Sequence, residues 1–255
     1  MDLIPLGVGE LAVLSVVAVL TAMLSAVVGM AGGITLLAAM LLFMPPLVVI
    51  PLHGAVQLVS NSSRTFIQRD HLRWDLIWRY GLLLLPAGFA GLAVAERIPP
   101  DAAKALIGAF VLFATWAPGL MLLGSHPQDA DPSRRFFALG GVAGVLNMTI
   151  GATGPLIAPF FLNLGLTRFQ LIGSKAACQA LGHLAKIAVF GIAGFAFGEW
   201  ALVLAILAAC VVAGTWLGSR LLHHVNEIWF VRLYKTVLTL IALRLLIGVL
   251  ISPSD

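Results

Sequence analysis

Charged residues and cysteines are both scarce in this chain. Asp, Glu, Lys and Arg make up 10% of its 255 residues, whereas a soluble domain carries about a quarter. The two cysteines, Cys178 and Cys210, lie inside apolar segments, where we expect buried thiols rather than a disulfide. Hydrophobic residues make up 60% of the chain and its mean hydropathy is +1.04. This composition predicts an all-α polytopic membrane protein.

Carboxylates are missing from the interior of the apolar segments. All 11 Asp and Glu residues lie in loops or near the ends of the predicted spans. Carriers driven by protons or cations usually keep an intramembrane carboxylate, so a cation or metal exporter is disfavoured. The net charge of +4 is attributed to cytoplasmic loops, and we expect no nucleic-acid partner.

Catalytic and metal-binding patterns are also absent. The sequence contains no nucleophile elbow, P-loop or HExxH motif. The adjacent pair His223 and His224 points in two directions on a helix, which does not suit a metal site. We therefore expect no metal and no cofactor, and an intramembrane enzyme is a disfavoured alternative.

The first ten residues contain no Lys or Arg, so the apolar run 11–28 is interpreted as part of the mature fold rather than a signal peptide.

What the sequence does contain is an internal repeat at an offset of 122 positions. Polar residues and glycines embedded in apolar runs fall on one another at this offset. The pairs are Gly29 with Gly151, Gly32 with Gly154, His53 with Lys175, Gln57 with Gln179, Asn61 with His183, and Arg64 with Lys186. Polar residues in hydrocarbon are costly and usually functional. The repeat therefore predicts a duplicated unit with one shared site, a plan common among secondary transporters.

Each half is predicted to contain about five helical elements, giving 8–10 membrane segments in all. The first repeat covers residues 1–123, the linker covers 124–134, and the second repeat covers 135–255. The predicted elements are 10–28, 34–49, 53–68, 77–95 and 103–123 in the first repeat, and 135–149, 155–166, 174–191, 198–219 and 227–251 in the second. The first two elements of each half are separated by glycine-rich breaks at 29–33 and 151–155, since Gly and Pro interrupt helices.

The distribution of Lys and Arg predicts that the two repeats are inverted relative to each other. The loop after the third element carries Arg69, Arg73 and Arg79, whereas its counterpart 191–199 carries no basic residue. The loop before the third element shows the opposite bias, with Arg168 and Lys175 only in the second half. Basic loops are cytoplasmic, so both termini are placed outside if each broken pair enters and leaves on one side. If 135–166 crosses once, the halves are parallel.

The third element of each half carries a polar stripe. Positions 53, 57, 61 and 64 are spaced by 4, 4 and 3 residues, as are positions 175, 179, 183 and 186. On an α-helix this spacing places all four on one face. Two such stripes facing each other form a cavity rich in positive charge and hydrogen-bond donors, which predicts a site for an anion.

The glycine breaks add donors to this predicted anion site. Helices that begin at Ile34 and Leu156 would point their N-termini inward, and helix N-termini attract anions. Thr35 and Thr153 could add hydroxyl groups. The predicted substrate-binding residues are Gly29, Gly32, Gly33, His53, Gln57, Asn61, Gly151, Thr153, Gly154, Lys175, Gln179 and His183. His53 or His183 could also carry a coupled proton.

Structural roles remain open for several of these residues. Each polar side chain could simply bind a neighbouring helix. Arg64 and Lys186 could snorkel to the interface, and Lys175 could be a cytoplasmic flanking residue. The role of Arg244, in the last span, is left open between lining the pathway and pairing with a backbone carbonyl.

The sequence resembles the TauE/SafE sulfite exporter family, also called the toluene sulfonate uptake permease family. The resemblance rests on the motif Gly29-x-x-Gly32-Gly33, its recurrence at Gly151, and the polar third helix with its Ser/Asn/Arg end. It covers nearly the whole chain, although Pro155 stands where the first repeat has Gly33. The resemblance implies a bacterial inner-membrane transporter of sulfite, sulfonates such as sulfoacetate, or related anions. An anion channel is the main alternative, and proton or Na⁺ coupling and a homo-oligomer are both possible.

Overall fold

The computed structural model describes residues 6–28, 32–117, 132–162, 164–221 and 227–251. This part of the chain contains eleven α-helices and no strand, which confirms the all-α prediction. The helices are α1 (Val8–Val28), α2 (Gly32–Met40), α3 (Pro46–Ile67), α4 (Trp74–Gly81), α5 (Leu84–Ala95), α6 (Pro100–Trp116), α7 (Pro132–Thr149), α8 (Gly154–Leu162), α9 (Arg168–Ile192), α10 (Ala201–Leu221) and α11 (Glu227–Ile251). Short 3₁₀ turns, Arg69–His71 and Phe197–Trp200, precede α4 and α10.

Several predicted helix boundaries are wrong. The helix predicted at 34–49 ends at Met40, and α3 begins at Pro46 rather than at 53, because Pro45 and Pro46 favour a helix start. The segment 77–95 is two helices, α4 and α5, bent by 41°. The helix α9 begins at Arg168 instead of 174, because Thr167 and Gln170 form a capping box at its start.

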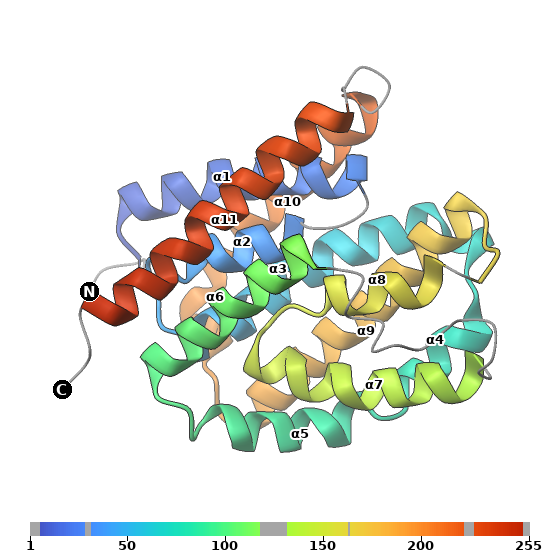
Figure 1. Cartoon of the computed structure of the whole chain (residues 1–255), viewed down its shortest axis with the longest axis horizontal. Coiled ribbons are helices and arrows are strands. Elements are labelled where there is room, and N and C mark those ends of the chain that lie inside the picture. The colour runs from blue at the N-terminus through green and yellow to red at the C-terminus, as the bar shows by residue number, and fades with distance from the viewer. Residues whose placement is uncertain (1–5, 29–31, 118–131, 163, 222–226, 252–255) are drawn as a thin grey trace.

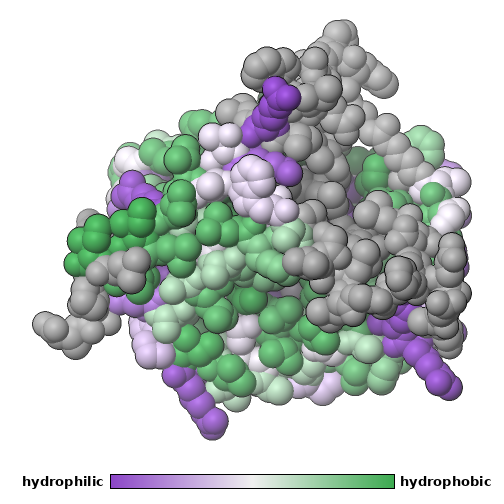
Figure 2. Space-filling view, viewed as in Figure 1, coloured by the Kyte–Doolittle hydropathy of each residue, from purple (hydrophilic) through white to green (hydrophobic). Residues whose placement is uncertain are grey.

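Two helical segments, Val8–Ala26 and Phe197–Gly218, are long and apolar enough to cross a membrane. The bent pair α4 and α5 would add a third if it forms one span. The exposed surface agrees with a lipid environment. Figure 2 shows hydrophobic residues across the middle of one face and hydrophilic residues mainly at its edges. The chain is a membrane protein, and the total of 8–10 segments stays a prediction.

Helix contacts follow a two-fold pattern that matches the sequence repeat. The helix α1 packs on α10, and its counterpart α7 packs on α5, while α3 packs on α9 and α6 on α11. In Figure 1 the pair α1 and α10 lies on one side of the molecule and the pair α5 and α7 on the other, with α3 and α9 between them. Helices α2 and α8 also begin 122 positions apart, at Gly32 and Gly154. This arrangement supports a duplicated unit, while the inverted topology stays a prediction.

Glycines allow the closest helix contacts in this arrangement. A Cβ on Gly140 of α7 would collide with the backbone carbonyl oxygen of Tyr80 on α4. A Cβ on Gly91 of α5 would lie 2.7 Å from the carbonyl oxygen of Val145. Small residues let helix backbones approach closely in membrane proteins, so α7 is held firmly against both α4 and α5.

Candidate functional site: a cationic helix pair between the two halves

The centre of the candidate site is the contact between α3 and α9, which run antiparallel. Near the start of α3, a Cβ on Gly54 would lie 2.7 Å from Cδ of Lys186, close to the end of α9. Near the end of α3, a Cβ on Gly173 would lie 2.7 Å from Cβ of Gln68. The backbone N–H of Arg73 donates to Oγ of Ser174 at 2.8 Å. The two predicted polar stripes therefore lie on helices that touch along their length.

His53 connects α3 to the first glycine break. Its Nε2 lies 2.7 Å from the carbonyl oxygen of Gly33, so Nε2 carries a proton and donates. Its ring also lies edge-to-face against His183 of α9, with centroids 5.7 Å apart. In the described part of the chain, Nδ1 of His53 and Nδ1 of His183 have no hydrogen-bond partner. Each histidine thus offers one unused ring nitrogen in a fully enclosed region.

Lys186 connects α9 to the second glycine break. Its Nζ donates to the carbonyl oxygen of Gly151 at 2.7 Å, and its side chain is 0% exposed. His53 also lies near the Gly151 carbonyl and interacts electrostatically with Lys186. The absence of a Cβ on Gly54 gives the lysine stem room to pass. Snorkelling of Lys186 to the interface is therefore ruled out.

Gly151 has a backbone conformation that suits glycine. It follows the end of α7 at Thr149 with a φ of +86°, in the left-handed region, and its N–H bonds to the carbonyl oxygen of Leu146 at 3.2 Å. Other L-residues rarely adopt this conformation, whereas glycine does so without steric cost. The break predicted at 151–155 therefore separates α7 from α8 and presents the Gly151 carbonyl to Lys186.

A second cationic group lies at the other end of the helix pair. Arg64 of α3 is buried and donates from Nη2 to Oδ1 of Asn61 at 2.7 Å. Nδ2 of Asn61 in turn donates to the carbonyl oxygen of Gln57 at 2.9 Å. Lys175 of α9 is 2% exposed and interacts electrostatically with Arg64. Lys175 thus lies inside the protein rather than on its surface.

The two glutamines of the stripes face the two glycine breaks. A Cβ on Gly33 would lie 3.2 Å from Oε1 of Gln57, and a Cβ on Gly154 would lie 2.6 Å from Nε2 of Gln179. Thr153 precedes α8 and its carbonyl accepts the N–H of Ile157 at 3.0 Å. Each break is therefore lined by an amide side chain from the adjacent stripe.

Most of the predicted site residues lie on or beside the α3–α9 pair. The structure places His53, Gln57, Asn61, Lys175, Gln179 and His183 at the α3–α9 contact, and Gly33, Gly151, Thr153 and Gly154 beside it. Gly32 instead packs against Thr21 and Ser25 of α1. Gly29 lies outside the described residues. Arg244 is exposed on α11 and does not line the α3–α9 contact.

Sequence reasoning missed two buried polar side chains beside the second break, Tyr80 and Asn147. Both are at most 1% exposed. At the 122-residue offset Tyr80 matches the apolar Leu202, whereas Asn147 matches Ser25. The one available signal is an asparagine embedded in the otherwise apolar stretch before the second break.

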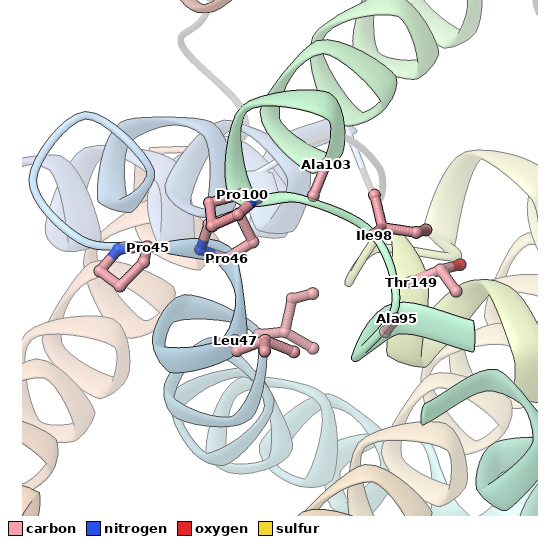
Figure 3. Close-up of a pocket in the computed structure, with 9 residues that line it drawn as sticks. Pro45, Pro46, Leu47, Ala95, Ile98, Pro100, Ala103 and Thr149 are labelled. Atoms are coloured by element: carbon pink, nitrogen blue, oxygen red, sulfur yellow. The ribbon is translucent and has the colours of Figure 1, made fainter. Parts of the chain in front are cut away.

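A small cavity opens near the start of α3. It holds about 60 Å³ and is lined mainly by apolar residues, among them Pro45, Leu47, Ile50 and Ile98, together with Thr149. Figure 3 shows most of this lining. Ile50 also lies against the second break, because a Cβ on Gly151 would be 3.1 Å from its Cγ1. The Ile50 side chain thus lies between the cavity and Gly151. None of the described residues that line the cavity is charged.

Negative charge is absent from the described core. Every acidic side chain that the structure describes is at least partly exposed, and the ion pairs found there, Arg69–Asp70 and Arg73–Asp75, lie on the surface. A search of the same residues finds no group of three or more His, Cys, Asp or Glu that could hold a metal ion. The buried cations Arg64, Lys175 and Lys186 therefore have no described carboxylate beside them.

The sequence model of the sulfite exporter TauE/SafE family matches residues 14–245. The chain belongs to the TauE/SafE family. The match covers both predicted repeats and both glycine breaks, and it confirms the resemblance found in the sequence. No curated protein and no solved structure matches the chain significantly. Membership in this family makes the chain a membrane transporter or exporter of sulfite-like anions.

Proposed function

We propose that this TauE/SafE protein is a secondary transporter of the bacterial inner membrane that carries small sulfur-containing or organic anions. Sulfite, sulfoacetate and other sulfonates are the proposed substrates. They bind between the two glycine breaks, against the α3–α9 pair. The observation that carries the proposal is the burial of Lys186, Lys175 and Arg64 at no more than 8% exposure with no described buried carboxylate.

Electrostatics explains why such a cluster favours an anion. A buried charge is costly unless it is paired and hydrogen-bonded. The described partners of two of these cations are neutral oxygens, the Gly151 carbonyl for Lys186 and Oδ1 of Asn61 for Arg64. An anion placed among them offsets both the desolvation of each cation and their mutual repulsion. The same charges repel cations, which disfavours a cation or metal exporter.

The helix arrangement suits alternating access. The helix α3 belongs to the first predicted repeat and α9 to the second, so the substrate contacts both halves. Rocking of one half against the other would expose this contact to each side of the membrane in turn. We place one mouth of the proposed pathway at the small cavity lined by Ile50, with Ile50 as the barrier between the cavity and the substrate.

The decisive experiment is sulfite counterflow in proteoliposomes. Wild-type protein is compared with Lys175→Ala and Gln57→Ala, and with Lys104→Ala, a partly exposed lysine on α6, as the matched control. We expect saturable exchange in the wild type and the control and its loss in both site variants. Exchange that survives both site substitutions would move the site elsewhere.

Counterflow also separates a carrier from a channel. A carrier exchanges labelled sulfite against an internal pool, whereas a channel only equilibrates the anion down its gradient. Absence of exchange with sulfite and with every tested sulfonate would contradict the proposed carrier function and favour the channel or cation alternatives.

A further inference from the structure

Tyr80 carries a hydroxyl group that the fold encloses but does not satisfy. Its side chain is 0% exposed. The hydroxyl lies close to Thr153, yet it makes no hydrogen bond of acceptable geometry with any residue that the structure describes. A buried hydroxyl left without a partner costs about 1–3 kcal/mol. The Tyr80 hydroxyl therefore needs a hydrogen bond with a ligand or a water molecule.

Asn147 supplies a second unsatisfied group at the same place. Its Nδ2 donates to the carbonyl oxygen of Gly182 on α9 at 2.6 Å, which fixes the orientation of the amide. Its Oδ1 has no hydrogen-bond partner among the described residues. A Cβ on Gly182 would lie 3.1 Å from Nδ2 of Asn147 and 3.5 Å from the Tyr80 hydroxyl. The side chains of Tyr80 and Asn147 thus both lie against Gly182 of α9, the residue before His183.

The N-terminus of α8 lies beside these two groups. Thr153 directly precedes this nine-residue helix, and its carbonyl accepts the N–H of Ile157; the N–H groups of a first helical turn have no intrahelical acceptor. Nε2 of Gln179 also approaches the start of α8, at 2.6 Å from where a Cβ on Gly154 would stand. Donors from the helix start, an amide and a phenol therefore surround one small region.

Close packing holds the phenol in place. The helix α4 ends at Gly81, where the 41° bend to α5 begins. Gly140 of α7 lies directly against the backbone of Tyr80, and Gly144 packs against Ala87 one turn later. A side chain anchored in this way is pre-organised, so it loses little entropy when it binds a ligand.

The geometry points to an oxyanion subsite formed by Tyr80, Asn147, Gln179 and the N-terminus of α8. This inference rests on the proposed transport function and adds the hydroxyl and amide groups that select the substrate. The anion's oxygens accept from Tyr80, Gln179 and the α8 backbone. Oδ1 of Asn147, which can only accept, receives a hydrogen bond from an O–H group of the ligand. The subsite thus selects an oxyanion that carries one acidic proton, such as hydrogensulfite.

The test exploits the small number of tyrosines. The chain contains two, Tyr80 and Tyr234, so Tyr234→Phe protein labelled with 3-fluorotyrosine reports on Tyr80 alone by ¹⁹F NMR. Sulfite at mildly acidic pH, where hydrogensulfite predominates, is titrated into the purified full chain. We expect a saturable shift of the Tyr80 resonance and no shift with chloride.

Affinity measurements on variants complete the test. Tyr80→Phe removes only the hydroxyl, and we expect it to weaken sulfite binding by roughly 10- to 100-fold, the range for a hydrogen bond to a charged group. Tyr234→Phe is the matched control and should bind like the wild type. Methanesulfonate, which lacks an acidic proton, should bind several-fold more weakly than sulfite to the wild type.

Three results would overturn the inference in distinguishable ways. Saturable sulfite binding without a shift of the Tyr80 resonance, or with unchanged affinity in Tyr80→Phe, would show that water fills this region and would leave the transport function standing. Methanesulfonate binding as tightly as sulfite would remove the role of Asn147. No sulfite binding by the wild type would overturn the proposed function and this subsite with it.

Discussion

His53 of α3 and His183 of α9 lie edge-to-face across the contact between the two halves, with ring centroids 5.7 Å apart and an interplanar angle of 80°. Each ring has one nitrogen without a partner among the described residues. Lys186 acts electrostatically on both rings, and Arg64 acts on His183. In the proposed transport function, an anion bound beside this pair would lower the cost of protonating either ring.

This pair predicts the pH dependence of transport. Protonation of a histidine that binds an anion is favoured by the anion, so substrate and proton should move together. We expect the His53→Ala, His183→Ala double variant to lose the pH dependence of sulfite exchange between about pH 5 and 8. Exchange rates are measured across this range in proteoliposomes. A normal pH profile in the double variant would rule out proton coupling through these residues.

Substitution of Lys186 should weaken sulfite binding much more than it changes thermal stability. Lys186→Met keeps the length of the side chain but removes a fully buried charge. The substitution relieves the desolvation cost of a buried charge but leaves the Gly151 carbonyl without its donor, so we expect only a small change in Tm. Loss of the cation should weaken sulfite binding by at least about tenfold. Thermal unfolding and binding are measured on the same sample, with Lys104→Met as control, and a variant that binds sulfite normally would contradict this role.

Gly32 should tolerate no side chain. A Cβ there would overlap the carbonyl oxygen of Thr21 and Oγ of Ser25 on α1, so α1 and α2 would have to separate. Overpacking of this kind costs about 1–3 kcal/mol, and we expect a clear fall in Tm for Gly32→Ala.

Gly248 provides the matched control for that substitution. It lies within α11, and a Cβ there would meet no atom within 4 Å. Gly248→Ala should leave Tm unchanged or raise it, since alanine is favoured over glycine in a helix by up to about 1 kcal/mol. Equal Tm values for Gly32→Ala and Gly248→Ala would refute the packing argument.

Ile50 should act as a barrier between the apolar cavity and the second break. It lines the cavity and also lies against Gly151. Ile50→Ala removes most of that layer, and we expect sulfite to leak down its gradient without a counter-substrate. Net efflux from loaded proteoliposomes measures the leak, with Ile98→Ala on the outer lining of the same cavity as control. Equal leak rates in the two variants would place the barrier elsewhere.

Sequence patterns predicted much of this arrangement. Because a helix repeats its faces at a fixed period, the spacing of His53, Gln57 and Asn61 was enough to place them on one face. Glycines in an apolar run likewise located the second break, between α7 and α8, whereas residues 29–31 of the first break lie outside the described residues. Helix boundaries were less predictable, since the capping box of Thr167 and Gln170 extends α9 beyond its apolar stretch. The inverted orientation of the halves stays a prediction from the charged loops.

The sequence by itself determined the membrane class, the 122-residue repeat and the polar stripes, because composition and periodicity are properties of local segments. Only the tertiary structure decided that α3 and α9 run antiparallel and that Lys186 is buried against Gly151. It also brought Tyr80 and Asn147 to the start of α8. The environment of these side chains depends on contacts between segments far apart in the chain, and the burial of a lysine or a tyrosine is settled by that packing.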